Sequence, residues 1–160
     1  MRRWIVPLLS AAAPCLFGLG GCALPAVDLR RDSTLAWIRD DLDPGARLIL
    51  GVPNSDDLRL MMICTPRSGA VDMTVFGRSG DTAIVELHAG KVWNRYRGAG
   101  HVDDELGGMV IDLQKLSAAD PVLQSFADTG ELMIRFRDRR EVLPNAFAPA
   151  HDFLAGCRLP

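Results

Sequence analysis

The first 22 residues decide which part of this chain can fold as a domain. Arg2 and Arg3 precede an apolar run from Ile5 to Leu19, and the small residues Gly20-Gly21 follow. A positive segment, an apolar run and small residues before a cleavage point are the architecture of a secretory signal peptide. As a membrane span the run is marginal in length, and prolines and glycines interrupt it. We therefore expect residues 1–21 to be a signal peptide that is not part of the folded domain.

Cys22 ends this segment in the sequence Leu19-Gly20-Gly21-Cys22. This stretch resembles the lipobox of bacterial lipoproteins, whose cysteine is diacylglycerated, exposed by cleavage and then N-acylated. The resemblance covers residues 1–22 and implies that acyl chains on Cys22 hold the protein on a membrane without a helix. It also implies that Ala23, in place of an aspartate, is compatible with the outer membrane of a diderm bacterium, facing the periplasm. The alternative is an ordinary signal peptide in which Cys22 is incidental.

Length and charge limit what the rest of the chain can be. Residues 22–160 suffice for one domain. We expect a tether over residues 22–33, followed by a single β-rich domain over residues 34–160. Without Arg2 and Arg3, the 18 basic residues become 16 against 20 acidic ones, a net charge of −4. This acidic balance argues against a nucleic-acid partner, which requires a basic face.

Two of the four cysteines remain for the domain, because Cys15 leaves with the signal peptide and Cys22 is assigned to the anchor. Cys64 and Cys157 lie 93 positions apart. In an oxidising compartment two such cysteines most simply form a disulfide, and closing a loop of this length stabilises a fold by about 4 to 5 kcal/mol. A redox-active thiol or a metal pair is the alternative, but the sequence has no Cys-x-x-Cys motif.

Alternating apolar and polar residues, separated by turn sequences, predict a β-meander over residues 46–96. Leu58–Cys64 is apolar on both faces, which predicts a strand covered on both sides. We expect a mobile loop over 98–108 and two more strands, over 109–113 and 131–137.

Two short helices complete the prediction. Asp120 and Pro121 are typical of an N-cap and a first helical position, and Gly130 is a stop signal, so residues 120–128 are expected to be helical. Pro149 opens a second short helix that ends near Gly156. The predicted fold is mainly β: an antiparallel β-sandwich or open barrel of about six to eight strands with two short helices and one disulfide.

No group of residues has the spacing of a catalytic or metal site. His88, His101 and His151 are isolated, and Ser79 is not in a Gly-x-Ser-x-Gly motif. We therefore predict no catalytic residue, no metal and no cofactor. A hydrolase that uses Ser79 or His101 is the weaker hypothesis, and it requires these side chains to converge in one pocket.

Basic residues on two predicted strands are the candidate binding residues. Arginines and one tyrosine would form a basic, partly aromatic face if these strands adjoin: Arg95, Tyr96, Arg97, Arg135, Arg137, Arg139 and Arg140. Such a face suits an anionic glycan, a lipid headgroup or an acidic envelope protein. The alternative is a pair of charged strand faces that only contact water.

Two further resemblances concern the domain. As a small envelope lipoprotein with one disulfide, a strand that enters the first cysteine of the domain and a meander after it, this chain is similar to the membrane-bound inhibitors of c-type lysozyme. The Ser-Gly-x-x-Tyr loop of that family is absent, because the only tyrosine is Tyr96, so no inhibitory residue is transferred. Gly51-Val52-Pro53 and Phe153-Leu154-Ala155-Gly156-Cys157 resemble segments of uncharacterised proteobacterial envelope proteins, which imply no activity. The sequence thus predicts a membrane-anchored, non-enzymatic binding or accessory module with an unknown ligand.

Overall fold

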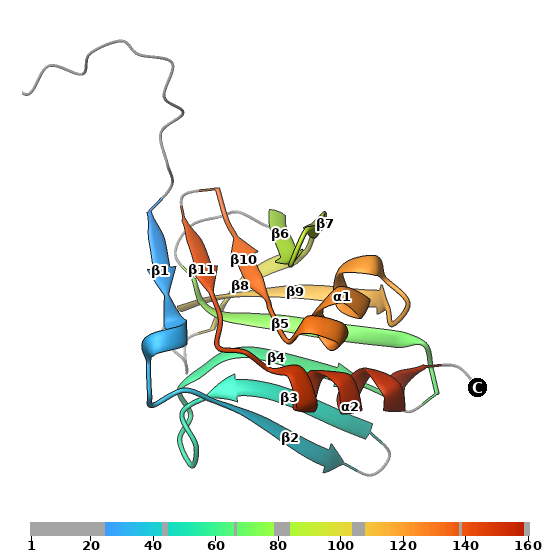
Figure 1. Cartoon of the computed structure of the whole chain (residues 1–160). Helices are drawn as coiled ribbons and strands as arrows, with labels where there is room; N and C mark the ends of the chain where they lie inside the picture. Colours follow the sequence, from blue (N-terminus) through green and yellow to red (C-terminus); the bar gives the residue numbers. More distant parts are fainter. Residues whose placement is uncertain are drawn as a thin grey trace, which may run out of the picture.

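The structure, a computed structural model, describes residues 25–42, 45–65, 67–78, 84–103, 108–137 and 139–158. In these residues 11 strands form two sheets, and two α-helices pack with them (Figure 1). The sheets do not close into a barrel. The predicted fold class, a mainly β sandwich with two helices and a disulfide, is confirmed, although the strands outnumber the six to eight expected. The predictions for Cys22 and Ser79 lie outside the described residues.

The larger sheet has six strands, and all its neighbouring strands are antiparallel. Its order is β2 (Ala36–Leu42), β3 (Gly45–Gly51), β4 (Leu58–Cys64), β5 (Ala70–Arg78), β9 (Gly108–Ser117) and β8 (Ala99–Asp103). Along β3 and β4, alternate side chains such as Leu48, Leu50, Leu60 and Met62 are completely buried, because successive residues of a strand point to opposite faces.

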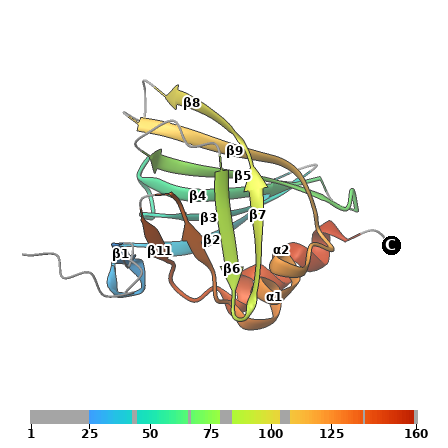
Figure 2. The ribbon, with the colours of Figure 1, turned by 90° about the horizontal axis from the view of Figure 1, so that it is seen from above.

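The smaller sheet has five strands and lies across the inner face of the larger one (Figure 2). Its order is β1 (Ala26–Asp28), β11 (Arg140–Val142), β10 (Met133–Arg135), β6 (Ile84–Ala89) and β7 (Val92–Arg97). Only the β1–β11 pair is parallel. β7 and β1 are the two edges of this sheet, so the hairpin of β6 and β7 lies at one end of it and the N-terminal strand at the other.

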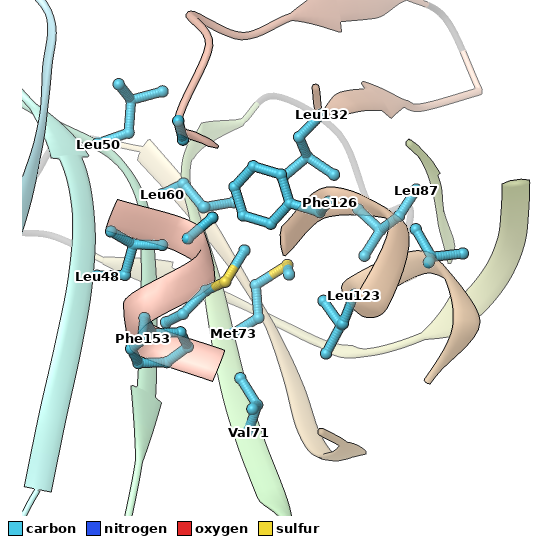
Figure 3. Packing of buried hydrophobic residues seen from close by; sticks show 14 of the residues in the cluster. Leu48, Leu50, Leu60, Val71, Met73, Leu87, Leu123, Phe126, Leu132 and Phe153 are labelled. Atoms are coloured by element: carbon cyan, nitrogen blue, oxygen red, sulfur yellow. The ribbon is translucent and has the colours of Figure 1, made fainter. Parts of the chain in front are cut away.

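One hydrophobic cluster joins both sheets and both helices. Phe126 of α1 (Pro121–Thr129) and Phe153 of α2 (Phe147–Cys157) are completely buried among side chains of the two sheets (Figure 3). As predicted, Asp120 caps α1 by accepting a hydrogen bond from the backbone N–H of Val122 at 2.8 Å, and Gly130 ends the helix at a φ of 70°. Leu87 of β6 and Leu132 contribute to the same cluster, which leaves the opposite face of the smaller sheet to solvent.

The predicted disulfide between Cys64 and Cys157 is present. It joins the end of β4, a central strand of the larger sheet, to the last residue of α2. The backbone N–H of Gly69 also donates to the Cys157 carbonyl at 3.0 Å. The C-terminal helix is therefore held on the sheet by a covalent bond and by its neighbouring hydrogen bonds.

The structure corrects two strand predictions. A single meander over residues 46–96 is wrong, because β3, β4 and β5 stay together while β6 and β7 join the other sheet. Full cover of the 58–64 strand is also wrong, since Ile63 is 37% exposed on the outer face. A two-layer sandwich covers only one face of each sheet, and an apolar outer face gives the same sequence pattern as a covered one.

Two segments expected to be irregular contain strands. Residues 99–103 of the expected 98–108 loop form β8, which pairs with β9. Within the expected tether of residues 22–33, Ala26–Asp28 forms β1 and Leu29–Arg31 a 3-10 helix. The three residues of β1 are all exposed, so they lack the apolar pattern by which a strand is recognised in a sequence.

Candidate anion-binding site

The candidate site lies on the outer, solvent-facing side of the smaller sheet. Strand register brings Arg135 of β10 opposite Glu86 of β6, and Glu86 opposite Arg95 of β7. Residues paired directly across neighbouring strands have side chains on the same face. β6 therefore inserts one carboxylate between two arginines that are far apart in the sequence.

Glu86 bonds to both of these arginines. Arg95 Nη2 and Nε lie 2.6 and 3.2 Å from Glu86 Oε1, and Arg135 Nη1 lies 3.2 Å from Oε2. The side chain of Glu86 is only 12% exposed, whereas those of Arg95 and Arg135 are 62% and 48% exposed. The Arg95 guanidinium is the main cause of a lowered pKa of Glu86, and the charge of Arg135 adds to it. Glu86 thus stays ionised and positions two guanidinium groups whose remaining donors reach solvent.

A cavity of about 330 Å³ lies at this point of the sheet. It has two apolar side chains as well as charged ones, and it is lined by Ile84, Glu86, Arg95, Arg135, Phe136 and Arg137. Arginine presents several N–H donors in a planar fork that suits carboxylate and phosphate oxygens. A cavity of this size with three arginines and an apolar edge can hold a small anionic group that carries an apolar or sugar portion.

Further arginines extend the positive surface. Arg97 lies opposite Ile84, and Arg140 lies opposite Arg135. Among the residues that the structure describes, Arg97, Arg137 and Arg140 have no carboxylate within ion-pair distance. We call the group the arginine face, and it consists of Glu86, Arg95, Arg97, Arg135, Arg137 and Arg140. The structure thus brings together five of the seven candidate binding residues: Arg95, Arg97, Arg135, Arg137 and Arg140.

Tyr96 points to the opposite side of the sheet, so it is not part of this surface. Its hydroxyl donates a 2.8 Å hydrogen bond to Asp120 Oδ1, the N-cap of α1. Burial and this carboxylate raise the pKa of Tyr96. In a strand the side chains alternate between faces, so Arg95 and Arg97 cannot share a face with the residue between them. The prediction of one face containing both the arginines and Tyr96 is wrong for Tyr96.

Trp93, and not Tyr96, is an aromatic side chain of the outer face. Trp93 is 57% exposed, and its ring stacks on that of His88, with centroids 5.7 Å apart and planes at 16°. His88 Nε2 lies 3.6 Å from Glu86 Oε2. A second cavity, of about 460 Å³, lies on this half of the sheet and includes His88, Met133 and Val142 in its lining. The outer face therefore has an arginine-rich end and a more apolar end.

Sequence reasoning missed Glu86, Ile84 and Trp93 as parts of this surface. Ile84, Glu86 and His88 are the outward positions of an alternating strand, which is a visible pattern. The residues that pair with them on β10 could not be identified from the sequence, because the pairing of β6 with β10 joins residues about 50 positions apart. Knowledge of the strand order would have been needed to find the site.

Among the described residues, His101 is not the central residue of a catalytic triad. His101 Nδ1 lies 3.5 Å from Asp112 Oδ2, and the hydroxyl of Thr74 donates to Asp112 Oδ1 at 2.8 Å. In a catalytic triad the imidazole lies between the hydroxyl and the carboxylate, where it can take the proton of the nucleophile. Here the carboxylate is in the middle, so neither His101 nor Asp112 activates Thr74 in that way. Ser79, the other residue of that hypothesis, is outside the described residues.

In the described ranges, no three His, Cys, Asp or Glu side chains gather closely enough to hold a metal ion. No helix in that part of the chain has both the length and the apolar character needed to cross a bilayer.

Comparisons of the chain with protein-family models, with curated proteins and with solved structures give no significant match.

Proposed function

We propose that this protein is a non-enzymatic binding module that is anchored in the bacterial cell envelope through a lipid on Cys22 and binds an anionic ligand at the arginine face. The observation that carries the proposal is the convergence of Arg95 and Arg135 on Glu86 at the edge of a 330 Å³ cavity. This arrangement fixes the orientation of two guanidinium groups before any ligand arrives. Pre-orientation lowers the cost of ordering them on binding.

Charge and chemistry support binding over turnover. The six residues of the arginine face carry five positive charges and one negative, a net charge of +4, on a chain whose overall charge is −2. Among the described residues that line the cavity, there is no serine, cysteine, histidine or lysine that can act as a nucleophile or as a general base. Glu86 is committed to two ion pairs, and its lowered pKa makes it a poor proton acceptor near neutral pH.

Titration of the purified full chain in detergent with inorganic tripolyphosphate tests the binding proposal. Charge-assisted hydrogen bonds from two or three arginines are expected to give saturable binding that weakens at high salt. Arg135→Ala should weaken binding about tenfold or more, as the loss of one such contact of about 1.5 kcal/mol or more predicts. The matched control is Lys91→Ala, which removes an exposed positive charge in the β6–β7 turn. Equal binding by the wild type and Arg135→Ala would contradict the proposal.

Mass spectrometry of the mature N-terminus tests the anchor separately. We expect an acylated cysteine from position 22 as the first residue, and an unacylated terminus would refute the lipid anchor. The lysozyme-inhibitor alternative has a simple test of its own. A lysis assay with c-type lysozyme should show no protection, in agreement with a Tyr96 hydroxyl that is bonded to Asp120 and not presented on a loop.

A further inference from the structure

We infer that the ligand of the arginine face is the anionic phospholipid headgroup layer of the membrane that holds the anchor. This inference rests on the proposed function, because it needs both the anchor on Cys22 and an anion-binding face. It adds the identity of the anion and the orientation of the domain.

The arginine face lies in line with the point at which the chain enters the fold. Register pairs Ala26 with Arg140, Arg140 with Arg135, Arg135 with Glu86, and Glu86 with Arg95. One row of residues thus crosses all five strands of the smaller sheet, from the first residue of β1 to β7. The backbone N–H of Arg140 also donates to the carbonyl of Pro25 at 3.1 Å, just before that row.

The remaining members of the face lie beyond this row, at the same end of the sheet. Arg97 pairs with Ile84, and Ile84 and Arg137 line the same cavity. β1 begins at this end of the sheet, where β10 ends and β11 begins (Figure 1). Trp93 and the β6–β7 turn lie toward the other end. The positive charges are therefore concentrated at the end from which the N-terminal segment leaves the domain.

The chain before β1 is too short to carry this end away from a membrane. Cys22 precedes Ala26 by four residues, which span at most about 14 Å when fully extended. Neighbouring strands are about 4.8 Å apart, so the row places Arg140 about 5 Å and Arg135 about 10 Å from Ala26. An acylated Cys22 lies at the bilayer surface, and the arginine face is then held within reach of the headgroups.

Charge and exposure at this end fit a headgroup layer. Each arginine near an anionic leaflet strengthens binding about fivefold, and three arginines of the face have no carboxylate within ion-pair distance among the described residues. Ile84 is 40% exposed among them and can contact the apolar part of the interface. Because the anchor already confines the domain near the surface, weak contacts suffice, as a tether raises the effective concentration into the millimolar range.

Hydrogen exchange of the reconstituted full chain tests this docking. The chain is incorporated into vesicles of phosphatidylcholine alone or of phosphatidylcholine with about a quarter phosphatidylglycerol. We expect slower amide exchange at β7 and at β10–β11 in the phosphatidylglycerol vesicles only, and we expect about 0.5 M NaCl to reverse it by screening. The triple variant Arg97→Glu, Arg137→Glu and Arg140→Glu should remove the protection. These three arginines are exposed and are not the arginines that bond to Glu86. Unchanged protection elsewhere in the variant checks that it is folded.

A matched control and a set of soluble anions separate the outcomes. The control, Arg31→Glu with Arg67→Glu and Lys91→Glu, reverses three exposed charges outside the arginine face and should keep the protection. Protection by tripolyphosphate but not by phosphatidylglycerol vesicles would overturn the membrane docking and leave the proposed function standing. Protection by the acidic glycan hyaluronan alone would likewise overturn it in favour of a glycan. Equal protection by both kinds of vesicle would overturn the recognition of anionic headgroups. Protection by none of these probes would overturn both that recognition and the proposed function.

Discussion

The two faces of the β6–β7 hairpin share one backbone but carry different kinds of side chain. The inner face presents Val85 and Leu87, both completely buried, and the half-buried Tyr96. The outer face presents Glu86, Arg95 and the exposed Trp93. Side chains along each strand point alternately to the two faces, so neighbouring residues lie on opposite faces. The inner face contributes to the hydrophobic core, and the outer face is where we propose that a ligand binds.

The largest effect that separates the two faces is expected for Leu87→Ala. Leu87 is completely buried between the sheet and α1, and the loss of a buried leucine side chain costs about 3 kcal/mol through lost burial and a residual cavity. Chemical denaturation of the purified chain measures this as a lower free energy of unfolding. Tripolyphosphate affinity at low denaturant should be unchanged, because the outer face keeps all its groups. Altered affinity in a folded Leu87→Ala variant would show that the faces are coupled.

An intermediate effect is expected for Tyr96→Phe. The change removes the hydrogen bond from the Tyr96 hydroxyl to Asp120 Oδ1 but keeps the ring, and one such bond contributes about 1 kcal/mol to stability. Asp120 still accepts from Val122, so the cap of α1 remains. A double-mutant cycle with Asp120→Ala isolates the coupling of the two side chains. A coupling near zero would contradict a link between β7 and α1 through this bond.

The sequence could predict both faces of single strands but not the partners across strands. Alternation alone placed Leu132, Ile134 and Phe136 inward and Arg135 and Arg137 outward, and the structure agrees. Local signals were also sufficient for α1, where Asp120, Pro121 and Gly130 have the predicted roles. Such features depend on a few consecutive residues, which is why they can be recognised without the rest of the fold.

The candidate site depends on contacts that no local pattern contains. Glu86 and Arg135 are 49 positions apart, and their contact follows from β6 joining β10 and not β5. Nothing in residues 70–90 marks the change from one sheet to the other. Grouping Arg95, Tyr96 and Arg97 by proximity in the sequence gave one residue on the wrong face, since alternation separates neighbours while register joins distant residues.

A smaller effect on stability, with a distinct pH dependence, is expected for Glu86→Gln. Its two partner arginines are largely exposed, so the loss of the carboxylate should cost at most about 1 kcal/mol at neutral pH. The pKa of Glu86 is lowered in the folded protein, so its contribution is complete above the ordinary carboxyl pKa of about 4.3 and is lost as the pH falls through the lower folded value.

Urea denaturation of the wild type and Glu86→Gln at neutral pH and near pH 3 measures that dependence. The difference in unfolding free energy between the two proteins should shrink in acid. A constant difference would show that the Glu86 ion pairs do not stabilise the sheet.

The smallest effect on stability is expected for Arg97→Ala, the residue next to Tyr96. Arg97 is exposed and has no acidic partner among the described residues, so its removal should change the unfolding free energy by less than about 0.5 kcal/mol. Binding should respond more strongly than folding, since one arginine near an anionic surface is worth about 1 kcal/mol, or about fivefold in affinity. Tripolyphosphate titration and vesicle binding at two salt concentrations measure this, with Lys91→Ala as the control. If Arg97→Ala destabilised the fold as much as Tyr96→Phe and left binding unchanged, the separation of the two faces into a folding face and a binding face would fail.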